Sequence, residues 1–251
     1  MKPHHEVSGP EGAPVVVLGN SLGTTTALWE PQLAELSERF RVVRYDHRGH
    51  GGSPASPGPY RIDDLAGDVL ELMDALGLQR VSYCGVSMGA MVGMWLAGHA
   101  PERVDRLVLC CTTASYDSAR PWEERAATVR ASGTGSIAPA VVSRWFTPAL
   151  GERSPETVAR FERMLSTVDD EGYAGCCEAL GALDLRPVLP LIQAPTAVIA
   201  GACDEATPPE RLRAIADAIP GAELTVLPDA AHLANVEAAG AVSQILRRHL
   251  G

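Results

Sequence analysis

The sequence predicts an α/β fold in which a mostly parallel, doubly wound sheet carries a helical insertion. Three observations predict it. Short, continuously apolar runs such as 15–18 and 104–111 are typical of strands buried on both faces of a parallel sheet. Stretches with helical spacing separate these runs, which gives the alternation of βα units. The alternation stops after Ser115 and resumes after Pro190, so the segment between them is expected to stand outside the sheet.

The segments before the insertion supply most of the sheet. Residues 4–7 are expected to form one edge strand, because the turn-forming segment 8–12 closes it. The helix at 62–76 is predicted from the spacing of its leucines and valine. The remaining elements are strands at 15–18, 41–45 and 104–111, a short strand that begins at Val81, and helices at 29–40 and, after the turn that carries Ser87, through residues 91–96.

The insertion has a helical character throughout. Its predicted helices are separated by glycine and proline and lie at 121–131, 137–146, 155–165 and 172–183. We expect residues 115–190 to form a helical cap and residues 1–114 and 191–251 to form the core domain. The core then ends with strands at 195–201 and 223–227 and helices at 209–218 and 236–250.

Length and charge limit the classes of partner. The chain has 251 residues, of which 46% are hydrophobic, enough for one large domain with an insertion. The formal net charge of −10 argues against nucleic acid or an anionic membrane as a partner. No apolar run is long enough to cross a bilayer, and no apolar leader follows the start. We therefore expect a soluble, cytoplasmic protein; its oligomeric state is not predicted.

The six cysteines indicate neither disulfides nor a metal site. None has C-x-x-C spacing, and the pairs 110–111 and 176–177 are adjacent in the sequence. Most of them lie in or beside apolar runs, as buried free thiols do in a reducing compartment.

The motif that organises the chain is Gly85-Val86-Ser87-Met88-Gly89, which fits the G-x-S-x-G nucleophile elbow. It follows a predicted strand and opens a predicted helix, which is the context that the motif requires. The turn strains the serine backbone, and the flanking glycines let strand and helix pass closely. The hydroxyl then lies at a helix N-terminus, where free N–H groups favour a developing anion.

A serine nucleophile needs a histidine base that is oriented by a carboxylate. Ligands of a parallel sheet gather beyond the carboxyl ends of its strands, so the partners are sought there. Asp204 follows the strand at 195–201, and His232 follows the last strand. We therefore predict Ser87, Asp204 and His232 as the catalytic residues, with Asp117 as the alternative acid.

Other histidines and acids near these positions have simpler interpretations. His47 and His50 lie in a glycine-rich loop and are expected to shape its turn, and Asp229 is expected to be a turn residue. His99 and His249 lie on predicted helices away from the strand ends.

The oxyanion hole requires two backbone N–H groups. One is expected from Met88, the residue after the nucleophile, and the other from the loop at 19–23, where Leu22 is our candidate.

The whole chain resembles the α/β-hydrolases, and more closely the 3-oxoadipate enol-lactonases. The particular stretches are Asn-Ser-Leu-Gly in the loop after the first buried strand and Arg-Trp-Phe and Cys-Cys-Glu in the insertion. The Asp-x-Arg-Gly-His-Gly and Gly-x-Ser-Met-Gly stretches are shared across the superfamily and say little about substrate. In full, the matching segments are 20–24, 29–32, 45–51, 85–89, 144–148, 173–178 and 204–209. The resemblance implies the same three catalytic residues. The chain departs from the family at one point: members of this fold usually have a full hairpin before the strand at 15–18, and here only about one strand fits, so we expect the first strand to be missing.

The resemblance also implies the reaction. The substrate would be a small anionic enol lactone bearing an acetate arm, opened to 3-oxoadipate in aromatic catabolism without a metal or an organic cofactor. Arg144 and Trp145, in the insertion, are the candidates for binding the substrate. A general small-ester hydrolase or a cofactor-free perhydrolase is the alternative enzyme, and a ligand-sensing receptor is the alternative of another class. A dehalogenase is disfavoured, since that chemistry needs an aspartate where Ser87 stands.

Overall fold

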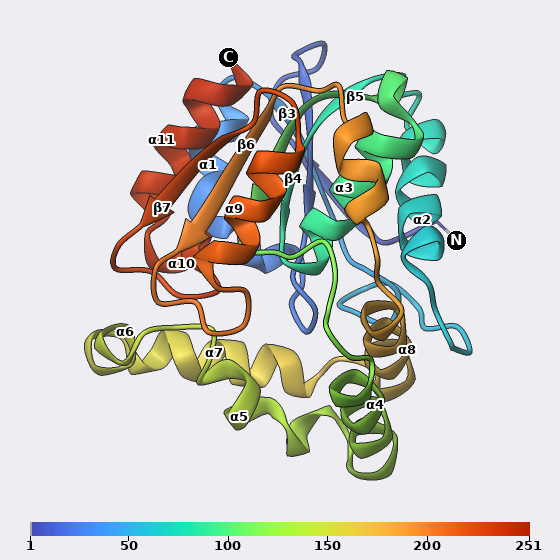
Figure 1. The fold of residues 1–251 in the computed structure, drawn as a ribbon, viewed down its shortest axis with the longest axis vertical. Helices are drawn as coiled ribbons and strands as arrows, with labels where there is room; N and C mark the ends of the chain where they lie inside the picture. Colours follow the sequence, from blue (N-terminus) through green and yellow to red (C-terminus); the bar gives the residue numbers. More distant parts are fainter. Residues whose placement is uncertain (1) are drawn as a thin grey trace.

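The computed structural model describes residues 2–251, so only the first residue of the predicted core domain lies outside it. A seven-stranded sheet forms its centre, with strand order β1-β3-β2-β4-β5-β6-β7 (Figure 1). β1 is antiparallel to β3, and every other neighbouring pair is parallel. This confirms the mostly parallel sheet. The strands are β1 (His5–Ser8), β2 (Val15–Gly19), β3 (Arg41–Tyr45), β4 (Val81–Val86), β5 (Val104–Cys110), β6 (Thr196–Gly201) and β7 (Glu223–Leu227).

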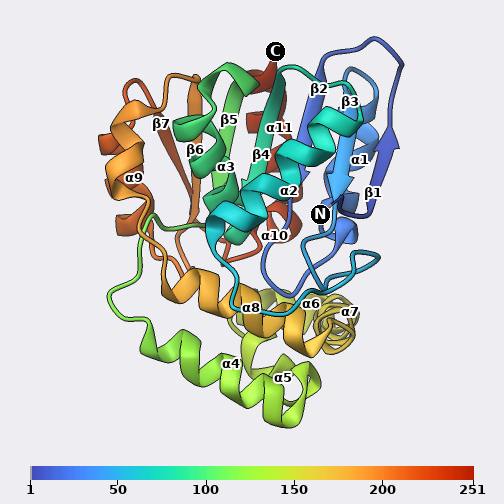
Figure 2. The same cartoon turned by 90° about the vertical axis from the view of Figure 1, so that its right-hand side faces the viewer.

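Helices cover both faces of this sheet, as the doubly wound prediction requires (Figures 1 and 2). α1 (Glu30–Ser37) and α11 (Ala239–Leu250) lie on one face. α2 (Ile62–Ala75), α3 (Met88–His99) and α9 (Pro209–Ala218) lie on the other. The connections include the short helix α10 (Ala234–Glu237) and the 3₁₀ turns η1 (Thr26–Trp29), η2 (Pro101–Arg103) and η4 (Arg186–Leu191).

β4 is completely buried, and so is most of α3. Val16, Val17 and Leu18 of β2 are fully buried, as a central parallel strand should be. α3 is apolar on nearly every side because it packs against the sheet, α2 and η4 together. The N-terminus of α3 is therefore fixed firmly with respect to the strands that precede it.

Five helices between β5 and β6 lie together beyond the carboxyl ends of the strands, at the bottom of Figures 1 and 2. We term them the cap. Arg130 of the cap forms ion pairs with Glu171 (2.8 Å) and Glu178 (2.5 Å), and so joins its first and last helices. The division of the chain at residues 115 and 190 stays a prediction. The cap elements are α4 (Arg120–Ser132), the 3₁₀ turn η3 (Thr134–Ser136), α5 (Ala138–Val142), α6 (Pro148–Arg153), α7 (Pro155–Ser166) and α8 (Asp170–Gly181).

Several predicted helices have different bounds in the structure. The helix expected at 137–146 ends at Val142, and a separate helix begins at Pro148, where the Thr147 hydroxyl accepts a hydrogen bond from the Leu150 N–H. Proline at the first helical position and threonine before it favour this new start. The last predicted helix is interrupted at Ala238, and α1 ends at Ser37. Within residues 2–251, one strand precedes β2, as expected.

The cysteine prediction is largely confirmed. All six cysteines are free and five are buried, whereas Cys203 is exposed.

Among residues 2–251, no helix combines the length and the apolar character that crossing a bilayer requires.

Candidate active site

Ser87 lies at the junction of β4 and α3 with a strained backbone. Its φ of 54° and ψ of −117° place it where non-glycine residues rarely lie. Two hydrogen bonds hold it there: the Ser87 N–H donates to the Cys110 carbonyl (2.9 Å), and the Thr112 hydroxyl donates to the Ser87 carbonyl (2.9 Å). The side chain is thereby presented at the carboxyl end of the sheet, as the elbow prediction expected.

The two glycines of the motif are required by close backbone contacts. A Cβ at Gly85 would lie 2.3 Å from the carbonyl carbon of Gly89, within the first turn of α3. A Cβ at Gly89 would lie 2.3 Å from the carbonyl carbon of Gly19, at the end of β2. Strand, helix and the loop after β2 therefore converge at Ser87 because neither glycine has a side chain.

Asp204 and His232 come from the loops after β6 and β7, and the structure brings them together. The His232 Nδ1 lies 2.9 Å from the Asp204 Oδ2, and both side chains are almost completely buried. The carboxylate can only accept, so the Nδ1 carries the proton and the Nε2 of the imidazole is left as an acceptor.

Thr207 donates two hydrogen bonds to the Asp204 carboxylate, a role that was not predicted from the sequence. The carboxylate accepts hydrogen bonds from the Ala206 N–H (2.8 Å), the Thr207 N–H (3.0 Å) and the Thr207 hydroxyl (2.6 Å). Burial alone would raise the pKa of Asp204. The charge of His232 and the hydrogen bonds from His232 and Thr207 outweigh burial, so the pKa lies below its ordinary value. Asp204 is therefore ionised at neutral pH.

Neither rival acid is hydrogen-bonded to His232. Asp117 is exposed and forms an ion pair with Arg211 (2.7 Å). Asp229 is exposed as well. The carboxylate that is hydrogen-bonded to His232 is that of Asp204.

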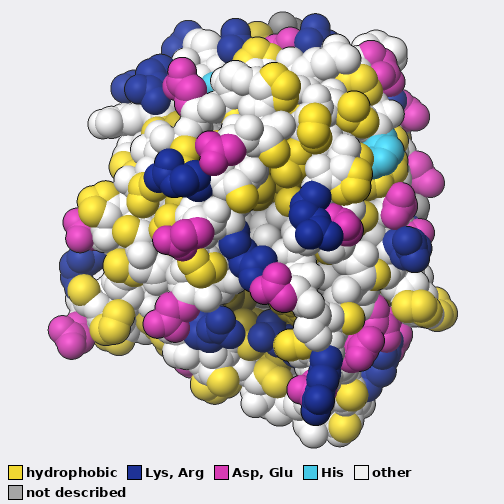
Figure 3. Space-filling model, in the orientation of Figure 1, with side chains coloured by type: hydrophobic (Ala, Val, Ile, Leu, Met, Phe, Trp, Pro, Cys, Tyr) yellow, Lys and Arg dark blue, Asp and Glu magenta, His cyan; other side chains and the backbone are white. Residues whose placement is uncertain are grey.

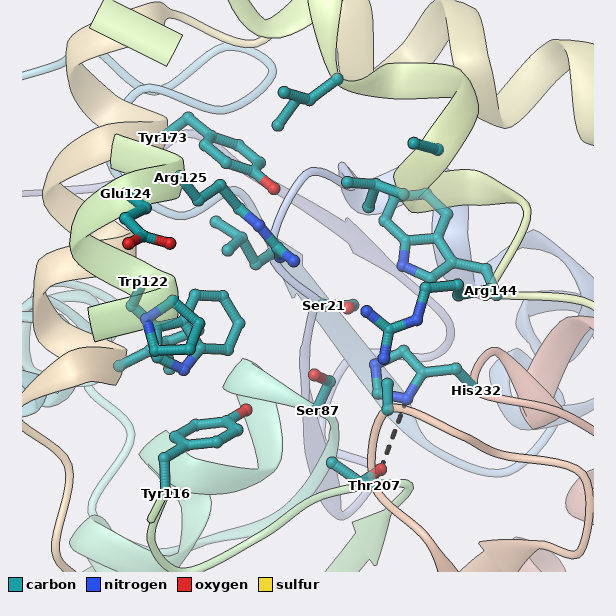
Figure 4. Close-up of a pocket in the computed structure, with 18 of the residues that line it drawn as sticks. Ser21, Ser87, Tyr116, Trp122, Glu124, Arg125, Arg144, Tyr173, Thr207 and His232 are labelled. Carbon is teal, nitrogen blue, oxygen red and sulfur yellow. Dashed lines mark hydrogen bonds between the residues drawn. The ribbon is translucent and has the colours of Figure 1, made fainter. Parts of the chain in front are cut away.

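Ser87 and His232 line the same pocket, which has a volume of about 770 Å³ and lies between the sheet and the cap (Figure 4). The Ser87 hydroxyl makes no hydrogen bond to any other group of residues 2–251 and faces this space. Figure 3 shows the surface hollowed between the sheet-bearing part and the cap, with arginine and acidic side chains around the hollow. Other lining residues come from the loops after β2 and β5, from α4, from the segment between α5 and α6, and from α8; they include Ser21, Leu22, Tyr116, Trp122, Arg125, Arg144, Trp145 and Tyr173.

The loop that carries Leu22 is attached to the start of α3. The Gly89 N–H donates to the Asn20 carbonyl (2.9 Å), which fixes the loop beside Met88. Within residues 2–251, the N–H groups of Leu22 and Met88 donate to no other protein group. Two free donors beside Ser87 are the arrangement that an oxyanion requires.

His47 and His50 fix this loop through hydrogen bonds to its backbone. The His47 Nε2 donates to the Asn20 carbonyl (3.0 Å), and the His50 Nε2 accepts from the Gly23 N–H (3.0 Å). Burial, followed by the neighbouring His50, lowers the pKa of His47 to about 3, and burial lowers the pKa of His50. Both rings are therefore neutral. They were expected to shape their own turn; the structure shows that they also position the neighbouring loop.

Comparison with known proteins identifies the family. The sequence model described as alpha/beta hydrolase fold matches residues 14–239. The chain belongs to the alpha/beta hydrolase family. A 3-oxoadipate enol-lactonase from Acinetobacter baylyi is 42% identical over 91% of this chain and 85% of its own length. The crystal structure of the enol-lactonase from Burkholderia xenovorans LB400 is 44% identical, with a TM-score of 0.96 over 98% of this chain and 95% of that one. A putative carbamate hydrolase from Stutzerimonas stutzeri is 32% identical over 98% of this chain and 96% of its own length.

The enol-lactonase resemblance is confirmed by these relatives, and the chain is an ester hydrolase. Arg144 and Trp145, the predicted binding residues, both line the pocket; Trp145 is buried and Arg144 is exposed. A second cap arginine, Arg125, reaches the pocket from the opposite side and was not predicted (Figure 4). It lies on a helix whose sequence has no motif, so only the fold reveals it.

Proposed function

We propose that this hydrolase opens 3-oxoadipate enol-lactone to 3-oxoadipate through a Ser-His-Asp acyl-enzyme mechanism, in the β-ketoadipate pathway of aromatic catabolism. The observation that carries the proposal is that His232, hydrogen-bonded to Asp204, lines the same pocket as Ser87, together with cap arginines suited to an anionic lactone. The enol-lactonase names of the relatives support the choice of substrate.

Acylation begins when the Ser87 oxygen attacks the lactone carbonyl. The Nε2 of His232 accepts the hydroxyl proton, and Asp204 stabilises the resulting imidazolium through the 2.9 Å hydrogen bond to Nδ1. The negative charge that develops on the carbonyl oxygen is accepted by the N–H groups of Leu22 and Met88. Each such donor lowers the barrier by about 3 kcal/mol in comparable sites.

The ring opens when the bond between the carbonyl carbon and the enol oxygen breaks. The leaving enolate takes the proton from His232, and its tautomerisation to a ketone removes the nucleophile that would close the ring again. A water molecule then gives a proton to His232 and attacks the acyl carbon. The Ser87 oxygen leaves with that proton, and the product is a dicarboxylate with a central ketone. None of these steps uses a metal or an organic cofactor.

The cap residues would recognise the substrate. Arg144, on the rim, attracts the carboxylate of the acetate arm. Trp145 lines the pocket and gives the lactone ring an apolar surface. Its indole packs edge-to-face on Phe161, with ring centres 6.1 Å apart, and this contact holds the indole in place. In this proposal the core, residues 1–114 and 191–251, performs the chemistry, and the cap at 115–190 selects the substrate.

The test is a steady-state assay of enol-lactone opening by the wild type and by Ser87→Ala. Wild-type turnover should be lost in the variant by at least about 10⁴-fold, because the nucleophile is absent. Unchanged circular dichroism and thermal midpoint would show that the variant is folded. Equal rates for the two proteins would refute the serine mechanism. Hydrolysis of a neutral aryl ester without lactone opening would instead favour a general esterase.

A further inference from the structure

Arg125 occupies a position in the pocket that the proposed mechanism has not used. It belongs to α4, is half-buried, and points its guanidinium group toward the space above Ser87 (Figure 4). Its guanidinium carbon lies 4.8 Å from the centre of the Trp122 ring, which orients the group without neutralising it. Among residues 2–251, no carboxylate forms an ion pair with it.

The acidic residues of the pocket are already paired with other arginines. Asp117 binds Arg211 (2.7 Å), and Glu124 binds Arg120 (2.7 Å). The positive charge of Arg125 is therefore available for an anionic ligand.

Beside Arg125, the hydroxyl of Tyr173 is completely buried, and within residues 2–251 no group accepts a hydrogen bond from it, since the neighbouring guanidinium can only donate. Buried hydroxyls are nearly always hydrogen-bonded, so this one marks a place where a ligand atom accepts. Burial raises the pKa of Tyr173 and the Cys177 thiol adds to this, whereas the charge of Arg125 and its hydrogen bond to the phenol oxygen oppose it. The phenol is thus a donor at neutral pH. In Figure 4 its oxygen points toward the guanidinium group.

Arg144 is a weaker candidate for a fixed carboxylate site. It is exposed, and it also lines a neighbouring cavity of about 590 Å³ whose walls include Glu205 and Glu210. Water and salt screen an exposed charge more than a half-buried one, and the two acidic neighbours lower the local potential further.

We propose that Arg125 and Tyr173 together form the seat of the substrate carboxylate and determine specificity for anionic lactones. The guanidinium group supplies a charge-assisted hydrogen bond, and the phenol supplies a second donor. Arg144 then acts at the rim, in guiding the anion rather than in holding it. This inference rests on the proposed lactonase function.

The experiment compares two lactones that share the same ring. One carries the acetate arm, and the other carries a methyl group in its place and is neutral. Arg125→Met should lower kcat/KM for the anionic lactone by about 10- to 100-fold, mainly through KM, and for the neutral lactone by less than about threefold. Tyr173→Phe should lower it by about 3- to 10-fold for the anionic lactone alone. Arg125→Lys should restore part of the loss, because the charge is kept and the fork geometry is not.

Arg153→Met is the matched control, since it removes an exposed cap charge that lies outside the pocket. It should leave both lactones unaffected. Equal losses of Arg125→Met on both lactones, or a selective loss only in Arg144→Met, would overturn the inference while leaving the proposed function intact. If the wild type opens neither lactone, the proposed function itself fails. Thermal midpoints of all variants distinguish an altered site from an unfolded protein.

Discussion

Replacing Thr207 by valine tests whether the alignment of Asp204 limits the reaction. The Asp204 carboxylate accepts four hydrogen bonds, and the one from the Thr207 hydroxyl, at 2.6 Å, is the shortest. Valine has nearly the same shape but no donor. A hydrogen bond to a buried charged group contributes about 1.5–3 kcal/mol, and two backbone donors still hold the carboxylate, so the lower end applies. A loss of about 1.4 kcal/mol in the transition state corresponds to a tenfold decrease in rate.

We therefore expect Thr207→Val to lower kcat about tenfold and the free energy of unfolding by about 1.5 kcal/mol. Steady-state kinetics with the enol lactone and urea denaturation measure the two quantities. Thr207→Ser, which keeps the hydroxyl, should retain most of the wild-type kcat. If the valine variant matched the wild type in kcat, or if the serine variant were as slow as the valine variant, the hydroxyl would have no positioning role.

Two further predictions concern the acid and the buried histidines. Asp204→Asn should lower kcat by about 10³- to 10⁴-fold, whereas Asp117→Asn should stay within about twofold; similar losses in both would contradict the assignment of Asp204. His47 has a pKa of about 3 in the folded chain and about 6.5 when unfolded, so the unfolded state binds more protons as the pH falls through this range. Protonation of His47 in the unfolded state should therefore lower the free energy of unfolding by about 1.4 kcal/mol for each unit that the pH falls below about 6. Urea titrations at several pH values should show a shallower slope for His47→Gln, and an identical slope would rule out this source of acid sensitivity.

The fold was predictable because its signals are local. The apolar run at 15–18 and the glycine-flanked Ser87 depend on steric and burial rules that act over a few residues. The break between α5 and α6 was missed although Thr147 and Pro148 are ordinary helix-start residues. Apolar residues on both sides of Thr147 and Pro148 give a continuous helical pattern. This pattern hides the helix start that the two residues indicate.

The parts of the site that could not be predicted depend on distant contacts. Thr207 follows Asp204 by three residues, and an aspartate with a threonine at this spacing is a common loop motif, so a local signal did exist. Arg125 has no such signal. Its neighbours in the pocket, Tyr173 and Ser87, are far from it in the sequence, and only the folding of the cap onto the core brings them together.

The cap and the core also touch through two glycines, and this restricts how new specificities can arise. A Cβ at Gly49 would lie 2.5 Å from the Gly172 Cα, and the Asp169 N–H donates to the Gly49 carbonyl (2.9 Å). Gly49 lies between His47 and His50, and Gly172 immediately precedes Tyr173. A chimera that receives a foreign cap without the matching 46–52 loop would therefore disturb the anion donors and the pocket roof at once. Grafted caps should succeed only when both segments are exchanged as one unit.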